Sequence, residues 1–154
     1  MNRTLKSALF GSLIALAASP AIAAQADDFE ADDFLRQAED AISRGDDRSA
    51  EQYYQSAIIY APATIAPYLG IAEFYSDSDE LDLAKKYFDI ALWLDPANPP
   101  AHKGLALLSL AQGDIADAEF HHEILVEACA PACPEAAEVR DAISANASSA
   151  MVVD

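Results

Sequence analysis

Cysteine and histidine, the residue types that most often carry thiol or metal chemistry, are confined to the second half of the chain. Cys129 and Cys133 can form a disulfide or act as a redox dithiol, and with His122 they can ligate a metal ion. Their spacing is CxxxC rather than CxxC, and no HExxH pattern is present. The sequence therefore favours a disulfide between Cys129 and Cys133. A thiol-redox or metal-binding protein centred on Cys129, Cys133 and His122 is the alternative.

Two adjacent histidines, His121 and His122, lie in a segment with helical spacing, and acidic residues flank them at 119 and 123. We expect His102, on the preceding helix, to approach His122. Packed or half-exposed histidines are more common than metal ligands in such a setting. No spacing argument brings together a Ser/His/Asp or Cys/His set. The sequence therefore offers no catalytic residues, and we predict a protein that is not an enzyme and has no metal or cofactor.

The charge balance of the 154 residues excludes several classes of partner. Nine Lys and Arg residues stand against 26 Asp and Glu residues, which gives a net charge of −17. A nucleic-acid-binding protein needs a basic surface to neutralise phosphates, and this chain has too few cations to form one. An anionic membrane surface is excluded for the same reason. No GxGxxG or GxxxxGK[ST] pattern occurs, so the common nucleotide-binding loops are absent as well.

The first 23 residues have the pattern of a secretory signal peptide. Two basic residues precede the uncharged apolar run 8–18, which is too short to span a bilayer, and small residues follow it. We expect cleavage after Ala23, with Ala26 as the alternative site, and no stable membrane anchor. Loss of the two basic residues would take the net charge from −17 to −19. The sequence predicts a periplasmic or secreted protein, typical of a Gram-negative bacterium, with an acidic leader at 24–30.

Residues of one type recur every 34 positions along the rest of the chain. Alanines form two such series, aromatic residues follow one of them four positions later, and prolines keep the same step. The members are Ala38, Ala72 and Ala106; Ala50, Ala84 and Ala118; Tyr54 and Phe88, with His122 in third place; and Pro62 and Pro96. Coincident series at one repeat period indicate a repeated structural unit.

Within one period the apolar residues have helical spacing, so each unit is predicted to be a pair of helices. Residues at i, i+3, i+4 and i+7 form one face of a helix. In the middle unit, small Ala72 should face small Ala84 and let the two helices approach closely. The pattern predicts first helices at 32–44, 66–76 and 100–111, and second helices at 47–60, 81–95 and 115–129.

These residues resemble the tetratricopeptide repeat (TPR), in which an aromatic, a Leu, a small residue and Tyr on the first helix precede Ala, an aromatic, Ala and Pro. The middle unit keeps Tyr68, Ile71, Ala72, Tyr75, Ala84, Phe88, Ala91 and Pro96. The first unit has Gln37 in place of Leu, and the third has His102 and His122 at aromatic positions and Leu125 at a small one. The resemblance implies an all-α solenoid with three TPR repeats at 31–64, 65–98 and 99–132.

A final segment, 133–145, is predicted to form a capping helix over the last repeat. Pro134 suits the first position of a helix and Glu135 suits its N-terminal turn. A solenoid needs such a polar-faced cap on its last open hairpin. The disulfide between Cys129 and Cys133 would fix this helix in place, and residues 146–154 are expected to form a flexible tail.

The resemblance also implies a concave groove, lined by the first helix of each repeat, that binds a partner protein or an extended peptide. The corresponding positions are Leu35, Glu39, Ile42, Leu69, Glu73, Ser76, Lys103, Leu107 and Leu110. Family members that clamp a peptide carboxylate use Lys, Arg and Asn there, whereas Glu39 and Glu73 have the opposite sign. We therefore expect a basic or neutral partner segment. The alternatives are ordinary exposed helix residues with no binding role, or a structural scaffold that self-associates.

Overall fold

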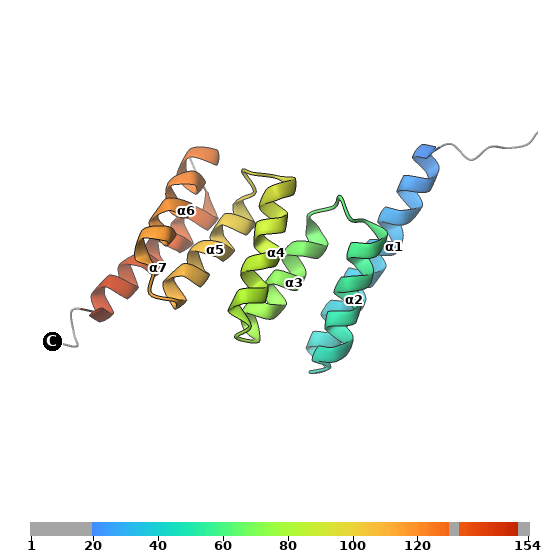
Figure 1. Cartoon of the computed structure of the whole chain (residues 1–154), viewed down its shortest axis with the longest axis horizontal. Coiled ribbons are helices and arrows are strands. Elements are labelled where there is room, and N and C mark those ends of the chain that lie inside the picture. The colour runs from blue at the N-terminus through green and yellow to red at the C-terminus, as the bar shows by residue number, and fades with distance from the viewer. Residues whose placement is uncertain (1–19, 130–132, 151–154) are drawn as a thin grey trace, which may run out of the picture.

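The computed structural model describes residues 20–129 and 133–150, with side chains for 30–129 and 133–148. These residues form helices and no strands, as Figure 1 shows. The helices are α1 (Pro20–Ser43), α2 (Asp47–Tyr60), α3 (Ala66–Asp77), α4 (Leu81–Leu94), α5 (Pro99–Ala111), α6 (Ile115–Ala128) and α7 (Pro134–Ala150). The boundaries of α2 to α6 lie within one residue of the predicted ones.

Helices pair into three hairpins that follow one another along the long axis of the molecule (Figure 1). The pairs are α1 with α2, α3 with α4, and α5 with α6, and α7 packs on both helices of the last pair. Within the described ranges, α1 approaches α3 and α3 approaches α5, whereas α2, α4 and α6 do not approach one another. First helices therefore converge on one side of the stack. The predicted all-α solenoid is confirmed.

Each hairpin closes through a residue in the left-handed backbone region. Gly45 and Gly113 occupy this position in the first and third hairpins, with φ of 69° and 80°. Asp79 occupies it in the second, with φ of 62°. Glycine adopts this conformation without a steric penalty, whereas a residue with a Cβ does not. The turn of the middle hairpin is therefore the strained one.

The residue after each of these turns is the N-cap of a second helix. Asp46 and Asp114 accept hydrogen bonds from the backbone N–H groups of Ser49, at 3.2 Å, and Asp117, at 3.0 Å. Glu80 holds the equivalent place in the middle hairpin and forms no side-chain capping bond. An aspartate in this position satisfies an N–H group that the helix leaves unpaired. The middle hairpin lacks that contribution.

Small residues form the contact between the two helices of each hairpin. The alanines of both repeating series are fully buried. They are Ala38 and Ala50, Ala72 and Ala84, and Ala106 and Ala118. Because the methyl group occupies little space, the helix backbones approach closely and every larger side chain is excluded. The predicted role of Ala72 and Ala84 agrees with their complete burial.

Glycine and an aromatic residue form the contact between successive hairpins. A Cβ on Gly70 would lie 2.5 Å from Cε1 of Tyr54, and one on Gly104 would lie closer still to Cζ of Phe88. Real Cβ atoms do not approach an atom this closely, so a Cβ at either position would force the facing ring to move. Gly70 and Gly104 are one repeat period apart and form a further series beside those of alanine, aromatic residues and proline.

At the N-terminal end, α1 starts at Pro20, well before the expected position 32. The segment 24–30, predicted to be an acidic leader, is therefore helical. Alanine recurs through residues 21–26, and alanine is the strongest helix former, which explains the extension. Residues 1–19, most of the predicted signal peptide, lie outside the described residues. None of the described helices is long and apolar enough to cross a bilayer.

At the C-terminal end, α7 runs to Ala150 rather than to the predicted position 145. The segment 146–150, expected to be part of a flexible tail, is helical, and residues 151–154 lie outside the described part of the chain. No proline or glycine interrupts 134–150 after Pro134. The Ser148 hydroxyl donates to the Ser144 carbonyl oxygen at 2.9 Å, so polar residues are accommodated within the helix.

Candidate functional site

The predicted groove residues all lie on the first helices α1, α3 and α5, which converge on one side of the stack. Glu39, Ile42 and Glu73 are exposed, and Leu35, Leu69, Ser76, Lys103 and Leu107 are half-buried. Leu110 differs, because it is only 9% exposed and packs in a cluster with Leu125 of α6 and Val139 of α7. Leu110 is therefore part of the hydrophobic core rather than of a groove surface.

A pocket of about 250 Å³ lies between α3 and α5. Its lining residues are Glu73, Ser76, Asp77, Phe88, Pro100, Lys103, Gly104 and Leu107. Four of these were predicted as groove residues: Glu73, Ser76, Lys103 and Leu107. The pocket therefore joins the first helices of two successive repeats.

Apolar and acidic groups meet in this pocket. Phe88 reaches it from α4 because Gly104 has no side chain to block the ring. Leu107 adds apolar surface, and the carboxyl groups of Glu73 and Asp77 belong to the same lining. Such a cavity can hold a side chain that combines an apolar stem with a cationic end. Sequence reasoning missed Phe88 and Gly104, although the regular spacing of Gly70 and Gly104 was available as a signal.

Negative charge gathers around the hydroxyl group of Tyr54. Burial raises the pKa of Tyr54, and the carboxylates of Glu39, Glu73 and Asp77 raise it further. The Glu73 residue is exposed as a whole, but partial burial of its carboxyl group also raises the pKa of that group, with nearby Lys103 acting in the opposite direction and Asp77 in the same direction. Carboxylates from α1 and α3 therefore act on one tyrosine. Glu39 and Glu73 therefore both lie near Tyr54.

Lys103 is the cation of the pocket, and α7 partly neutralises it. Its Nζ atom lies 3.2 Å from Oε2 of Glu138. Glu138 is exposed to water and also joins the capping helix to α5. Glu138 follows Gly104 by one repeat period, so α7 occupies the place that the first helix of a fourth repeat would take. Because Lys103 is paired with Glu138, it neutralises less of the negative charge of Glu73 and Asp77 in the pocket.

The histidines are arranged differently from the prediction. His102 contacts His121 and not His122, with the two Nδ1 atoms 2.9 Å apart. Helix α6 buries Ala118, His121 and Leu125, whereas His122 is half-buried. The imidazole of His121 gains a hydrogen-bonding partner inside the hairpin, and a buried polar ring needs one. The expected contact between His102 and His122 is therefore wrong.

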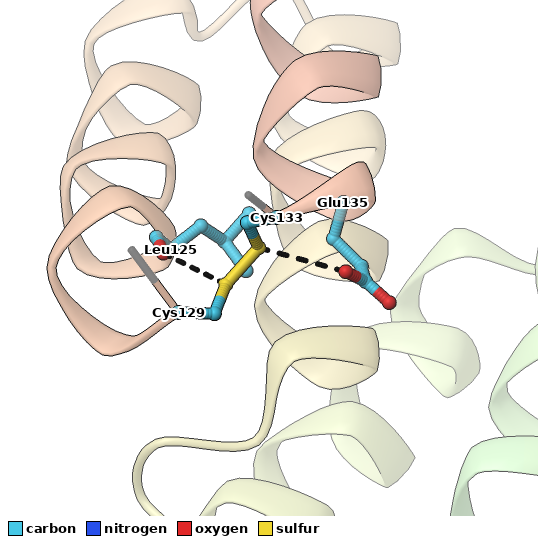
Figure 2. The surroundings of a disulfide bond; sticks show 4 residues. All are labelled: Leu125, Cys129, Cys133 and Glu135. Atoms are coloured by element: carbon cyan, nitrogen blue, oxygen red, sulfur yellow. Dashed lines mark hydrogen bonds between the residues drawn. A yellow bond between two sulfur atoms is a disulfide. The ribbon is translucent and has the colours of Figure 1, made fainter. Parts of the chain in front are cut away.

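Cys129 and Cys133 form a disulfide in the structure, with their Cα atoms 5.3 Å apart (Figure 2). The bond joins the end of α6 to the residue before α7. The carbonyl oxygen of Leu125 lies 3.0 Å from Cys129 Sγ, and Oε2 of Glu135 lies 3.5 Å from Cys133 Sγ. Bonded sulfurs have no proton to donate, so these approaches are contacts rather than hydrogen bonds.

The alternative metal site centred on both cysteines and His122 does not assemble. Among the described residues, the group with metal-ligand geometry consists of Cys129, Cys133 and Glu135, and His122 is not part of it. With the two sulfurs bonded to each other, neither is a thiolate, and thiolate is the form that binds metal. The disulfide therefore serves as a covalent link between α6 and α7.

No protein-family model matches the sequence, and no curated protein matches it either. Solved structures do have a similar fold. The first TPR domain of Spaghetti (RPAP3), bound to the HSP90 peptide SRMEEVD, is 16% identical, with a TM-score of 0.68 over 79% of this chain and 98% of that chain. The TPR2B domain of yeast Sti1, in a complex with pHsp70, is 17% identical, with a TM-score of 0.70 over 79% and 98%.

A bacterial structure is similar as well. The type III secretion chaperone SycD of Yersinia enterocolitica, in complex with a peptide of the translocator YopD, is 19% identical, with a TM-score of 0.65 over 79% of this chain and 92% of that chain. At these identities the likeness concerns the fold. Together with the regular repeat period, the stacked hairpins and the small-residue contacts, it shows that the chain has the tetratricopeptide-repeat fold.

Proposed function

We propose that this protein is a non-catalytic interaction module that binds a partner protein or an extended peptide segment on the side formed by its first helices. The pocket between α3 and α5 is the observation that carries this proposal, because it offers an apolar floor and carboxyl groups in one cavity. Similar folds in the RPAP3 and SycD structures hold peptides. A groove of this kind fits an extended segment with one side chain anchored in the pocket.

The partner segment is basic or neutral in this proposal. Glu39, Glu73 and Asp77 act together on Tyr54, and Lys103 is paired with Glu138. A cationic side chain entering the pocket would meet two carboxylates, Glu73 and Asp77, that Lys103 compensates only in part, whereas an anionic one would be repelled. The peptide SRMEEVD in the RPAP3 structure is acidic, so this chain would require a partner of different charge.

Export is the second part of the proposal. The basic, apolar and small-residue segments of 1–23 support a periplasmic or secreted location, and a disulfide between Cys129 and Cys133 is suited to an oxidising compartment. Intact-mass measurement of the protein expressed in a Gram-negative host tests both features. Export predicts a chain that begins at residue 24 or 27 and has lost two hydrogen atoms. A full-length, reduced chain would contradict it.

A peptide selection tests the binding proposal without knowledge of the natural partner. The purified protein is used to select from a random peptide library, in parallel with a Glu39→Lys plus Glu73→Lys variant. A matched control, Glu119→Lys plus Glu127→Lys, makes the same charge change at exposed positions of α6. We expect the native protein and the control to enrich peptides with Lys or Arg beside apolar residues. The groove variant should lose this enrichment. Equal enrichment by all three would refute the groove assignment.

Self-association is a second candidate, supported by an apolar pair on the second helices. Ile59 of α2 is 76% exposed and Trp93 of α4 is 82% exposed, and they occupy equivalent positions of successive repeats. Repeated exposed apolar residues are typical of an interaction surface. Sedimentation velocity at several concentrations distinguishes the two functions. Growth of a dimer that Trp93→Ser abolishes would favour the scaffold, and a monomer at all concentrations would exclude it.

A further inference from the structure

A buried histidine pair joins the two helices of the third hairpin. His102 of α5 is 3% exposed and His121 of α6 is 6% exposed, and their Nδ1 atoms are 2.9 Å apart. Nε2 of His102 lies 3.0 Å from the carbonyl oxygen of Pro96, in the connection between α4 and α5. The pair therefore joins α5 to α6 and to the connection that follows α4, and neither the pocket nor the disulfide accounts for it.

The hydrogen bonds determine which nitrogen of each ring carries a proton. A carbonyl oxygen only accepts, so Nε2 of His102 must donate to Pro96. The neutral His102 ring then has a lone pair on Nδ1, and Nδ1 of His121 must donate to it. Nε2 of His121 is left as the one unprotonated nitrogen that makes no bond within the pair. The neutral pair is thus fully bonded, with one vacant proton position.

A first additional proton can be accommodated at that vacant position. Nε2 of His121 lies 3.8 Å from Oδ2 of Asp117, which accepts a hydrogen bond from the Ser109 hydroxyl at 2.6 Å. A proton on this nitrogen would form an ion pair with the carboxylate and break no bond of the pair. Lys85 and Asp89 of α4 also act on His121, and their charges oppose each other.

A second proton cannot be accommodated in the same way. It would have to bind Nδ1 of His102, directly opposite the Nδ1–H group of His121. Two donors 2.9 Å apart form no hydrogen bond, and two imidazolium charges at this distance in a buried site repel strongly. The contact between the two rings must then open.

We propose that the His102–His121 pair is a proton-operated lock that holds α5 against α6 within the third hairpin and opens when both rings are charged. Opening separates the two rings, whereas the charged His102 ring keeps its Nε2–H bond to the carbonyl oxygen of Pro96. Lys103 follows His102 on α5 and lines the pocket, so the lock also positions one wall of that pocket. Acidification is therefore coupled to the packing of α5, which forms this wall.

The preceding repeat contains the same connection without a titrating ring. Tyr68 and Pro62 hold the positions that His102 and Pro96 hold one repeat later. The hydroxyl of Tyr68 donates to the carbonyl oxygen of Pro62 at 2.9 Å. Tyr87, the counterpart of His121, acts electrostatically on Tyr68, and burial raises the pKa of Tyr68 above its usual value. This hydroxyl therefore stays protonated at every relevant pH, and the chain supplies its own pH-insensitive counterpart.

The direction of the pH response follows from the same burial. Burial is the largest cause of the lowered pKa of His121, and it outweighs the opposite effect of Asp117. A lowered pKa means that the folded state favours the neutral ring. The stability that the neutral His121 ring contributes is therefore complete above the unfolded value of about 6.5 and is lost as the pH falls toward the folded value. This first proton leaves the pair closed. The second proton must bind beside an existing imidazolium charge, so the lock is closed at neutral pH and opens only in more acidic solution than the first protonation requires.

Long-range ¹⁵N spectra of the native protein test the bonding pattern directly. At pH 7.5 we expect His102 to carry its proton on Nε2 and His121 on Nδ1. His121 should accept the first proton of the pair on Nε2. The same protonated nitrogen in both rings at pH 7.5 would overturn the lock. This test uses no variant, so a variant that fails to fold leaves it intact.

Hydrogen exchange, corrected for the intrinsic effect of pH, tests the mechanical consequence. Between pH 7 and pH 4, protection of residues 96–106 should fall by about tenfold or more, because local opening exposes their amides. Residues 62–72, held by Tyr68, should keep their protection. His102→Tyr plus His121→Tyr copies the second repeat and should abolish the response. His122→Gln, one residue from the lock, should leave it unchanged. An undiminished response in the double variant, or none in the native protein, would overturn the proposal.

Discussion

The interior junctions of the stack and its C-terminal end are held by different forces. Between hairpins, Tyr54 packs on Gly70 and Phe88 packs on Gly104, so the contact depends mainly on shape, and the Tyr75 hydroxyl also donates to Oε1 of Glu51 at 2.8 Å across the first junction. In the third repeat the aromatic position is His122 and the glycine position in α7 is Glu138. Polar and covalent bonds take over there, namely the His102–His121 pair, the Lys103–Glu138 ion pair and the Cys129–Cys133 disulfide.

This difference determines which conditions each region responds to. Apolar packing changes little with pH, salt or redox state. In contrast, an imidazole pair responds to pH, an ion pair to salt and a disulfide to the redox state. The pocket lies where the two kinds of construction meet, because Phe88 belongs to the interior and Lys103 to the C-terminal end. We therefore expect the N-terminal wall of the groove to be constant and the C-terminal wall to be adjustable.

Overpacking the interior should have the largest effect. Ala84→Leu places a large side chain at a fully buried helix contact and should lower the free energy of unfolding by about 1–3 kcal/mol. Lys86→Leu, an exposed change on the same helix, should alter it by less than about 0.5 kcal/mol. Urea titration followed by circular dichroism measures both. Equal effects would show that Ala84 is not at the closest contact.

Removal of the disulfide should have the next largest effect and act at the other end. Cys129→Ser plus Cys133→Ser removes a five-residue covalent loop, for which chain entropy gives about 2 kcal/mol. Hydrogen exchange should show the loss of protection in α7 and not in α3. The native protein measured with and without added reductant serves as the matched comparison. Unchanged hydrogen-exchange protection in α7 would mean that the apolar contacts of Val139 hold this helix without the disulfide.

The contact between Phe88 and Gly104 should show a smaller net effect. Gly104→Ala gains about 1 kcal/mol from helix propensity but overpacks against the Phe88 ring by about 1–3 kcal/mol. We expect a net loss of about 1 kcal/mol. In a Phe88→Leu background the same change should be neutral or stabilising, since the obstructing ring is gone. A double-mutant cycle with no coupling between the two positions would contradict the shape-based junction.

The turn of the middle hairpin should accept a stabilising change. Asp79→Gly removes the backbone strain of a non-glycine residue in the left-handed region. Glu80→Asp supplies the N-cap hydrogen bond that Asp46 and Asp114 provide in the other two hairpins. Together they should raise the free energy of unfolding by about 1 kcal/mol. The thermal unfolding midpoint should rise accordingly. A fall would mean that Asp79 makes a contribution in this turn beyond its backbone conformation.

Regular repeats explain how much of this structure could be predicted. The alanine series predicted α2 to α6 within one residue because each alanine reports a close helix contact. The prediction failed where the pattern degenerates. In α2 and α4 the buried residues lie at i, i+4 and i+7, but α6 buries Ala118, His121 and Leu125, at i, i+3 and i+7. His121 is buried because it bonds to His102, whereas His122, at the aromatic position of the repeat, is only half-buried.

The candidate site was predictable only along one helix at a time. Glu73, Ser76, Lys103 and Leu107 follow from their repeat positions, and all four line the pocket. Phe88 and Gly104 depend on how one hairpin stacks on the next, and Glu138 depends on how α7 completes the stack. Leu110 was misplaced for the same reason, because α7 covers it. The sequence of one repeat therefore does not predict the contacts that it makes with the next repeat.

The central claim is that the first helices form an acidic binding groove, and a titration of three proteins tests it most directly. A fluorescent peptide taken from the selection with the native protein is titrated onto that protein, onto Glu39→Lys plus Glu73→Lys, and onto the control Glu119→Lys plus Glu127→Lys. Helical content is checked for each by circular dichroism. The groove variant should bind about tenfold more weakly and the control about as well as the native protein.

Raising the salt from about 50 to about 300 mM should weaken native binding and have less effect on the groove variant, because the screened charges are then already absent. Native affinity in the groove variant, or an equal loss in both variants, would contradict the account and place binding on another face of the stack.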